Sequence, residues 1–477
     1  MSKNRLLIYF RVSTLRNTTH PLGLLGLLVV YISLLLLVIF LSLEFVGIHS
    51  SPYMGILTFM ALPACIAVGL AMVFIGRVRG RKRMAADGSS SLYAFPHWDL
   101  NLPEHRRKFG VMLITVTFLL TLTAMVSYRG VEFMESVTFC GKTCHVVMQP
   151  EHLAYSNSPH ANVACVDCHI GPGAGWFVKS KISGLRQVIA VLSDNFSRPI
   201  ATPIHNLRPA RDTCEQCHWP EKFHGDRLLL KRHFQEDEEN SELVNLLLLK
   251  VGGGSSESGF AEGIHWHMSP DTKVDYIADE KREEFFWIRS EDAEGHVREF
   301  VKDGFEADEA FFAQHEIRRM DCMDCHNRPT HSFEEPGYAL DKAIASGAIA
   351  REIPFIKREM MKAIQADYPS REVAEVEITN SLEAFYADSD WSESAELASA
   401  IERSREIYLR NVFPEMNIDW GTYPTHIGHE DFPGCFRCHD DEHSTPEGET
   451  ISQDCENCHS ILAWEEEDPE ILGELFP

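Results

Sequence analysis

Three long runs of apolar residues follow one another in the first 130 residues, and polar segments separate them. The runs are Pro21–Val46, Tyr53–Gly76 and Phe109–Tyr128. Each reaches the roughly 20 residues that a helix needs to cross the hydrocarbon core of a membrane. The alternative for the first run is a cleaved signal peptide, but the apolar region of such a peptide is shorter, typically about 7–15 residues. We therefore predict a retained membrane anchor of three helices in residues 1–130.

The basic residues beside these runs are unevenly distributed. Four of them precede the first run, and eight more lie between the second and third runs, in residues 77–108. The loop of residues 47–52 has none. Because Lys and Arg are enriched in cytoplasmic loops, we expect the N-terminus and residues 77–108 in the cytoplasm. Everything after Tyr128 is then exported, which predicts a bacterial inner-membrane protein with a periplasmic domain.

The exported part changes its pattern twice. Residues 226–320 contain short apolar runs broken by Gly and Asp, such as Lys273–Ile277 and Phe285–Arg289, which predict hairpin strands. Residues 337–412 instead have the spacing of amphipathic helices, as in Glu393–Tyr408. Residues 131–225 are rich in turns and leave little room for sheet.

The net charge changes sign along the chain. Residues 1–129 hold 13 Lys and Arg against 4 Asp and Glu, and the remainder holds 31 against 66. The exported part therefore has a formal charge of −35 within a total of −26. This acidic excess argues against nucleic-acid binding, which needs a basic surface, and favours a basic protein partner. A purely solubilising role for the acidic surface is the alternative.

Twelve of the 13 cysteines lie in the exported part, and all twelve belong to one repeated motif. Five copies read Cys-x-x-Cys-His, and the first copy has one additional spacer residue. Cys-x-x-Cys-His attaches haem covalently, with the histidine as the proximal iron ligand. We expect six haem c groups, held by Cys140 and Cys144, Cys165 and Cys168, Cys214 and Cys217, Cys322 and Cys325, Cys435 and Cys438, and Cys455 and Cys458. The expected proximal ligands are His145, His169, His218, His326, His439 and His459.

Three other chemistries use similar cysteine spacing. Zinc knuckles pair two Cys-x-x-Cys units around one metal, and disulfides suit an exported domain. Neither explains a histidine after every second cysteine. A thioredoxin-like redox centre needs one such motif rather than six. Six copies outside the membrane segment therefore favour haem.

The second axial ligand of each iron has to come from elsewhere in the chain. Thirteen further histidines lie in the exported part, enough for bis-histidine ligation of six haems. Candidates near motifs or in turn-rich stretches are His160, His224, His265, His267, His331, His426, His429 and His443. Met148 is a further candidate for the first iron, because Met also serves as an axial ligand. His265 and His267 are expected on one face of a strand, since residues i and i+2 align there.

These features predict a membrane-anchored multihaem cytochrome c. Its fold is expected to be mostly α-helical and irregular, packed around haem, with three N-terminal transmembrane helices and a small β insertion. The predicted organisation is an anchor at 1–130, a three-haem domain at 131–225, the β insertion at 226–320, and a second three-haem domain at 321–477 with a helical stretch at 337–412.

The order of elements over residues 109–225 resembles the NapC/NirT (NrfH-like) membrane cytochromes. The resemblance rests on a membrane helix, a first motif with a nearby Met, and the sequence Ser-Pro-His-Ala-Asn-Val-Ala-Cys-Val-Asp-Cys-His. It implies transfer of electrons from quinol, here menaquinol, to periplasmic redox partners. The longer chain, with Cys-Glu-Gln-Cys-His-Trp-Pro and a C-terminal haem pair, looks like the larger inner-membrane members used in anaerobic, metal-reducing respiration.

The chain departs from that family pattern in three ways. It has three predicted spans rather than one, more than the usual four haems, and a first motif with three spacers and a shifted Met148. The resemblance also implies a quinol site with a lysine after the second motif. The matching residues are Lys179 and Lys181, for which lipid headgroups are the alternative partners.

We weighed three functions. The first is an electron conduit from the quinone pool to a periplasmic cytochrome or reductase, with the lipid bilayer as its surroundings. The second is a terminal reductase that binds nitrite or a similar small substrate at an open haem. The third is a sensor or a relay subunit of a larger reductase complex.

Overall fold

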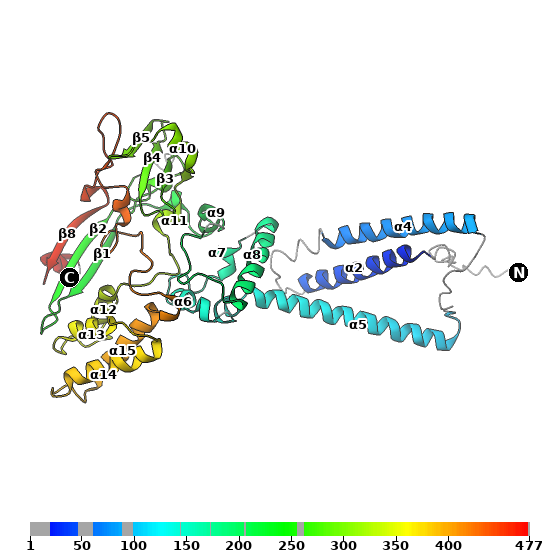
Figure 1. The fold of residues 1–477 in the computed structure, drawn as a ribbon, viewed down its shortest axis with the longest axis horizontal. Helices are drawn as coiled ribbons and strands as arrows, with labels where there is room; N and C mark the ends of the chain where they lie inside the picture. Colours follow the sequence, from blue (N-terminus) through cyan, green and yellow to red (C-terminus); the bar gives the residue numbers. More distant parts are fainter. Residues whose placement is uncertain are drawn as a thin grey trace. The chain divides into compact units, whose positions relative to one another are not determined.

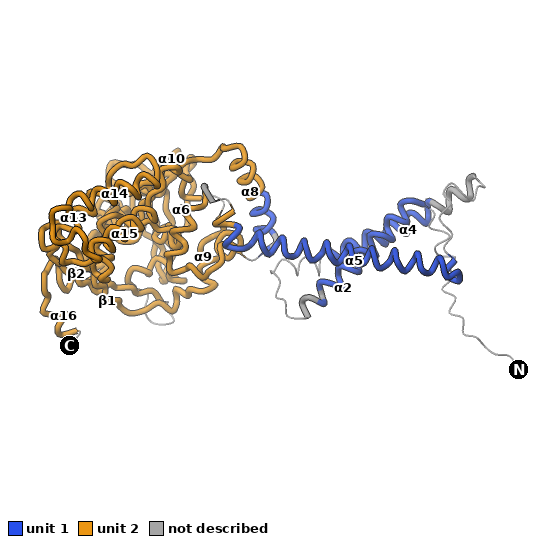
Figure 2. Tube along the Cα trace, turned by 90° about the horizontal axis from the view of Figure 1, so that it is seen from below, with its two compact units in different colours: residues 1–139, 172–182 blue, residues 140–171, 183–477 orange. Residues whose placement is uncertain are grey.

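The computed structural model describes residues 20–45, 61–87, 99–143, 145–171, 173–204, 207–254 and 262–475. These fall into two compact units (Figure 2). Unit 1 contains residues 1–139 and 172–182, and unit 2 contains residues 140–171 and 183–477.

Unit 1 contains the three helices that the apolar runs predict. They are α2 (Pro21–Phe45), α4 (Leu62–Asp87) and α5 (Pro103–Met134), and each is long and apolar enough to cross a membrane. Most of their large apolar side chains are exposed, as a lipid environment requires. The first eight residues of the predicted run Tyr53–Gly76 lie outside the described residues.

Glycines allow α2 and α4 to pack backbone against backbone. A Cβ atom on Gly26 of α2 would lie 2.6 Å from the carbonyl oxygen of Gly69 on α4. A Cβ atom on Gly69 would lie 2.7 Å from Cγ2 of Val30, and one on Gly76 would lie 2.5 Å from the backbone nitrogen of Gly23. Small residues at such positions are typical of helix pairs that associate within membranes.

We expect Gly69→Leu to separate α2 from α4 and to destabilise the anchor, because overpacking a tight contact costs about 1–3 kcal/mol. Gly110→Leu on α5 is the matched control, since a Cβ atom there meets nothing within 4 Å. The measurement is the resistance of the purified, detergent-solubilised protein to unfolding by sodium dodecyl sulfate. Equal loss of resistance in both variants would contradict the close contact.

Unit 2 begins with short helical segments and turns. These are η2 (Phe139–Thr143), α6 (His145–Ser156), α7 (Cys165–His169), the last part of α8 (Ala174–Leu192), α9 (Ala210–Cys214) and η3 (Pro220–Lys222). No strand occurs among the described residues of 131–225. The backbone of this region is therefore held by local turns rather than by a sheet.

Two antiparallel sheets follow (Figure 1). The first has the order β1-β2-β8, with β1 at Arg227–Phe234, β2 at Glu242–Leu249 and β8 at His459–Glu466. The second has the order β6-β3-β4-β5-β7, with its strands at Arg318–Arg319, Lys273–Ala278, Phe285–Glu291, Val297–Lys302 and His443–Ser444. Strands β7 and β8 come from the C-terminal segment, so both sheets join residues 227–319 to the end of the chain.

The predicted helical stretch forms the largest apolar core. It contains α12 (Pro336–Ala345), α13 (Ile356–Ile364), α14 (Arg371–Tyr386) and α15 (Ala395–Asn411), which pack together (Figure 1). A buried ion pair between Lys357 of α13 and Asp341 of α12 joins this core to β1, since Asp341 also accepts a hydrogen bond from the backbone N–H of Phe234. The remaining short elements are η5 (Trp266–Met268), α10 (Glu309–Gln314), α11 (Cys322–Cys325), η6 (Pro414–Met416), η7 (Gly434–Arg437), η8 (Cys455–Asn457) and α16 (Glu470–Leu475).

Candidate functional site

Each cysteine motif lies on a short helical turn. In α11 the backbone N–H of His326 donates to the carbonyl of Cys322 at 2.7 Å, and His218 and His439 repeat this bond to the first cysteine of their motifs at 2.9 and 3.1 Å. One turn of helix therefore separates the two cysteines and carries the histidine beside the second. This is the local geometry that covalent haem attachment requires.

Five of the six motif histidines each lie beside a second histidine. With the motif histidine first, the pairs are His169 with His331, His218 with His160, His326 with His265, His439 with His267, and His459 with His429. The ring centroids are 6.0–6.3 Å apart in every pair, whereas the angle between the rings varies from 7° to 88°. Aromatic packing prefers particular tilts, so a constant separation at variable tilt indicates another cause.

The separation fits two imidazoles on opposite sides of one iron. A ligating imidazole nitrogen lies about 2 Å from its metal, which places two opposed nitrogens about 4 Å apart and the ring centroids about 6 Å apart. Burial lowers the pKa of His169, His326 and His459, and lowers that of His267 to about 4. These side chains are therefore neutral near pH 7, and neutral imidazole is the form that binds metal.

Several of these rings form a hydrogen bond between Nδ1 and a backbone carbonyl, so Nε2 is the nitrogen that could bind a metal. Nδ1 of His265 bonds to the carbonyl of Val251, and those of His267 and His439 bond to other carbonyls, all at 3.0 Å. Such an outer hydrogen bond fixes the orientation of a ligating imidazole. Nδ1 of His160 is buried and has no hydrogen-bond partner among the described residues.

His331 is held most extensively. Its Nδ1 lies 3.0 Å from the carbonyl oxygen and 3.2 Å from the carboxylate of Glu151 on α6. That carboxylate receives two hydrogen bonds from Arg328, at 2.9 and 3.0 Å. The guanidinium of Arg328 lies 4.0 Å from the ring centroid of Tyr423. Glu151, which precedes the second motif, thus orients His331, which follows the fourth motif.

The prediction of a strand at His265 and His267 is wrong. His267 lies within the 3-10 helix η5, and His265 is the residue directly before its first position. The tight turn directs the two rings to different motifs, His265 to His326 and His267 to His439. A strand would have placed both rings on one face.

Four other candidates lie in different settings. His224 is exposed, with Nδ1 2.7 Å from the carbonyl of Lys222. His426 is buried and bonds by Nδ1 to the carbonyl of Asp324, and burial lowers its pKa to about 4. Met148 packs partly buried against an apolar cluster that includes Phe413.

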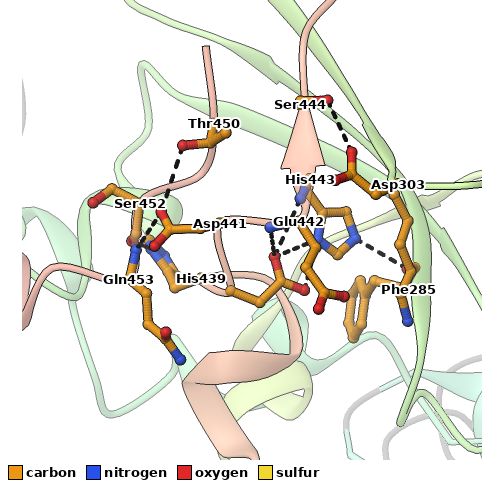
Figure 3. A network of polar contacts seen from close by, with 12 residues as sticks. Phe285, Asp303, His439, Asp441, Glu442, His443, Ser444, Thr450, Ser452 and Gln453 are labelled. Carbon is orange, nitrogen blue, oxygen red and sulfur yellow. Dashed lines mark hydrogen bonds and ion pairs between the residues drawn. The ribbon is translucent and has the colours of Figure 1, made fainter. Parts of the chain in front are cut away.

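The fourth, His443, uses both ring nitrogens within the protein. Its Nδ1 lies 2.9 Å from the carboxylate of Asp440, and its Nε2 lies 3.0 Å from the carbonyl oxygen of Phe285 (Figure 3). With neither nitrogen free, this side chain joins β4 to the segment after the fifth motif. We do not include it among the proposed ligands.

The first motif is described only in part. Cys144 and the side chain of His145 lie outside the described residues. The ring of His152 lies against Gly141 of this motif, so closely that a Cβ atom on Gly141 would be 2.0 Å from Cδ2 of His152. The sequence analysis missed His152. Its position seven residues after His145, two turns along one helix face, could have indicated it.

Cysteines of consecutive motifs interact with one another. Cys140 is hydrogen-bonded to Cys165, and Cys214 to Cys322. In the other consecutive pairs burial has the larger effect in raising the pKa of one thiol, and the other thiol is near enough to raise it further: Cys217 acts on Cys168, Cys435 on Cys325, and Cys435 on Cys458. Helix α9 of the third motif also contacts α7 of the second and α11 of the fourth. Arg437 of the fifth motif donates to the carbonyl of Asp324 in the fourth. The six motifs therefore form one series in the order of the sequence.

The two candidate quinol-site lysines have different partners. Nζ of Lys181 lies 3.8 Å from Oε1 of Glu135 and 4.8 Å from the ring centroid of Phe177. Nζ of Lys179 lies 4.4 Å from the ring centroid of Trp176. Oε1 of Glu135 is buried and has no hydrogen-bond partner among the described residues. Glu135 was not among the candidates from the sequence, because it follows the predicted run Phe109–Tyr128 by seven residues, whereas in the structure it directly follows α5.

Known proteins are similar to this chain in sequence. Residues 103–203 match the model of the N-terminal region of the NapC/NirT cytochrome c family. Over 458 residues the chain is 42% identical to the cytochrome c-type protein ImcH of Geobacter sulfurreducens, which covers 94% of this chain and 90% of that protein. No solved structure matches the chain.

The chain belongs to the NapC/NirT cytochrome c family. It is therefore a membrane cytochrome of electron transport with covalently bound haem c, as the cysteine motifs and apolar helices predict. The family model ends at residue 203, before the third motif. The assignment of individual ligands consequently depends on the geometry above.

Replacing His331 tests the paired histidines. In the haem-loaded protein we expect His331→Ala to leave one haem iron without its second axial ligand and to add one high-spin signal to the electron paramagnetic resonance spectrum. His296→Ala is the control, because His296 is exposed and bonds only to Asp292. An unchanged, fully low-spin spectrum of His331→Ala would contradict the assignment of His331.

Proposed function

We propose that this NapC/NirT cytochrome oxidises menaquinol in the membrane and passes the electrons through six haems to a periplasmic redox partner in anaerobic respiration. The observation that carries this proposal is the unbroken series of six motifs, five of them with a histidine pair at about 6 Å. Haem, when bound, supplies reversible one-electron chemistry. The protein supplies the attachment, the axial ligands and the order.

The direction of the series follows from its two ends. The first motif begins at Cys140, six residues after α5 ends at Met134, and the sixth lies near the C-terminus. An electron that enters at the first motif meets the others in sequence order. The basic residues before α2, in the last part of α4 and in the first part of α5 support a cytoplasmic N-terminus and a periplasmic haem domain.

Glu135 and Lys181 are our proposed quinol-site pair. Oxidation of a quinol releases two protons and two electrons, so the site needs a group that takes up a proton. Oε1 of Glu135 is buried and accepts no hydrogen bond from the described residues, and Nζ of Lys181 lies 3.8 Å from it, so this oxygen is available to accept a proton from the quinol. Lys179, over Trp176, is better placed to meet lipid headgroups.

A terminal reductase is the second candidate function. It needs an iron with an open coordination position, and the five histidine pairs argue against one at motifs two to six. Conversion of a small substrate such as nitrite would then be confined to the first motif. A relay role within a larger complex is compatible with the conduit and differs only in the source of electrons.

Anaerobic addition of a reduced menaquinol analogue to the detergent-purified, haem-loaded protein tests the proposed function. We expect rapid reduction of several haems, and the haem absorption bands measure it. Haems that dithionite reduces but menaquinol does not would refute quinol oxidation by this chain. Binding of nitrite to a high-spin haem would instead support the reductase.

We expect Lys181→Gln and Glu135→Gln each to slow quinol-dependent haem reduction about 100-fold, the usual scale for losing a proton-transferring group. Reduction by dithionite should not change, because it bypasses the quinol site. Arg186→Gln is the matched control, as an exposed cation on the same helix as Lys181. Lys179→Gln should resemble this control, and wild-type rates in both Lys181 and Glu135 variants would exclude the pair.

A further inference from the structure

We propose that the outer edge and face of β8, beside the sixth motif, form a docking surface for a soluble, lysine-rich c-type cytochrome. The inference rests on the proposed function and locates the point where electrons leave the chain. We call this surface the exit surface and define it by Ile461, Trp464 and the carboxylates of residues 454–468.

The side chains that would hold the sixth haem are themselves close to solvent. Cys455 is exposed, and so is His429, the histidine that lies opposite His459. By contrast, the corresponding histidines of the other four pairs are half-buried, namely His160, His265, His267 and His331. Electron transfer between proteins needs close approach of the two redox groups, and the end of the series offers it.

Strand β8 also has a free side. Among the described residues it pairs with β2 alone, in the order β1-β2-β8, so it forms the edge of its sheet. Two large apolar residues on it are exposed, Ile461 by 48% and Trp464 by 54%. Exposed aromatic residues surrounded by charges are typical of the centre and rim of protein interfaces.

The charge around this strand specifies the partner. Residues 430–477 hold 15 Asp and Glu and a single basic residue, Arg437. Arg437 donates from its guanidinium to the backbone carbonyls of Arg282 and Asp324, and Lys250 of the neighbouring segment donates to the backbone carbonyl of Glu456. Neither cation forms an ion pair with a carboxylate of the exit surface among the described residues. Glu465, Glu466 and Glu467 are exposed and form no ion pair among the described residues. A lysine-rich surface complements this field and is steered towards it.

The two properties together favour a transient electron carrier over a permanent subunit. Two exposed apolar residues are a small patch, whereas stable assemblies bury large apolar areas. A charged rim around a small apolar centre instead gives fast association and dissociation. In each encounter one haem of this chain loses one electron and one haem of the carrier gains it.

Binding can be measured without any electron transfer. The probe is mitochondrial cytochrome c, a lysine-rich soluble cytochrome, titrated in its oxidised form against the oxidised full-length protein in nanodiscs. Replacement of Glu465, Glu466 and Glu467 by Gln should weaken binding about tenfold at low salt and reduce its salt dependence. Trp464→Ala should weaken binding while preserving the salt dependence.

A control of equal charge change lies on the helical core. Glu383→Gln, Asp388→Asn and Glu396→Gln together remove three exposed carboxylates from α14, α15 and the segment between them. This variant should bind within about twofold of the wild type, because its carboxylates lie outside the exit surface. Equal weakening in both triple variants would show a general charge effect and would overturn the proposal.

Cross-linking gives a second readout. A carbodiimide joins carboxylates to lysines in contact, and we expect the joined peptides to come from residues 454–474. Cross-links concentrated in another segment would overturn the exit surface. Menaquinol reduction of the same samples separates the two proposals, because failure of quinol reduction refutes the proposed function, whereas normal reduction with unaltered binding refutes only the exit surface.

Discussion

The arrangement of the region that contains the cysteine motifs depends on one constraint, the pairing of two imidazoles at a ring-centroid separation of 6.0–6.3 Å. Each pair brings two chain segments together, and the segments are usually distant in sequence, as with His169 and His331. Residues 131–225 contain only short helices and turns, so their backbone has little regular structure of its own. Paired ligands thus supply long-range order that a sheet or helical bundle would supply elsewhere.

Charged side chains complete this order where the backbone is irregular. Arg328 holds Glu151, which holds His331, and Arg437 fastens the fifth motif to a carbonyl of the fourth. Both arginines donate to several acceptors at once, which their planar, fork-shaped guanidinium allows. The helical core of α12–α15 contains no cysteine motif, and it is joined to the first sheet through Asp341 and Lys357.

Local sequence patterns predicted the helices and the cysteine motifs. The pairing of each motif histidine with a second histidine is visible only in the three-dimensional structure. The apolar runs predicted all three membrane helices, and cysteine spacing located every turn that could carry haem. His160, His265, His267, His331 and His429 were all among the candidates, but nothing local distinguishes them from His224 or His443. Turn geometry rather than periodicity separates His265 from His267, and Glu135 gains its significance from Lys181, which is remote in sequence.

The interleaving of ligands has a consequence for biogenesis. If the chain crosses the membrane from its N-terminus, His160 crosses before His218. The histidine pair of the third motif can then form as soon as that motif has crossed. The histidine pair of the second motif cannot form at that stage, because His331 follows the fourth motif. Under the proposed topology, His331 would reach the second motif only after more than half of residues 131–477 had crossed the membrane. Export and the pairing of the second motif would then be coupled in time.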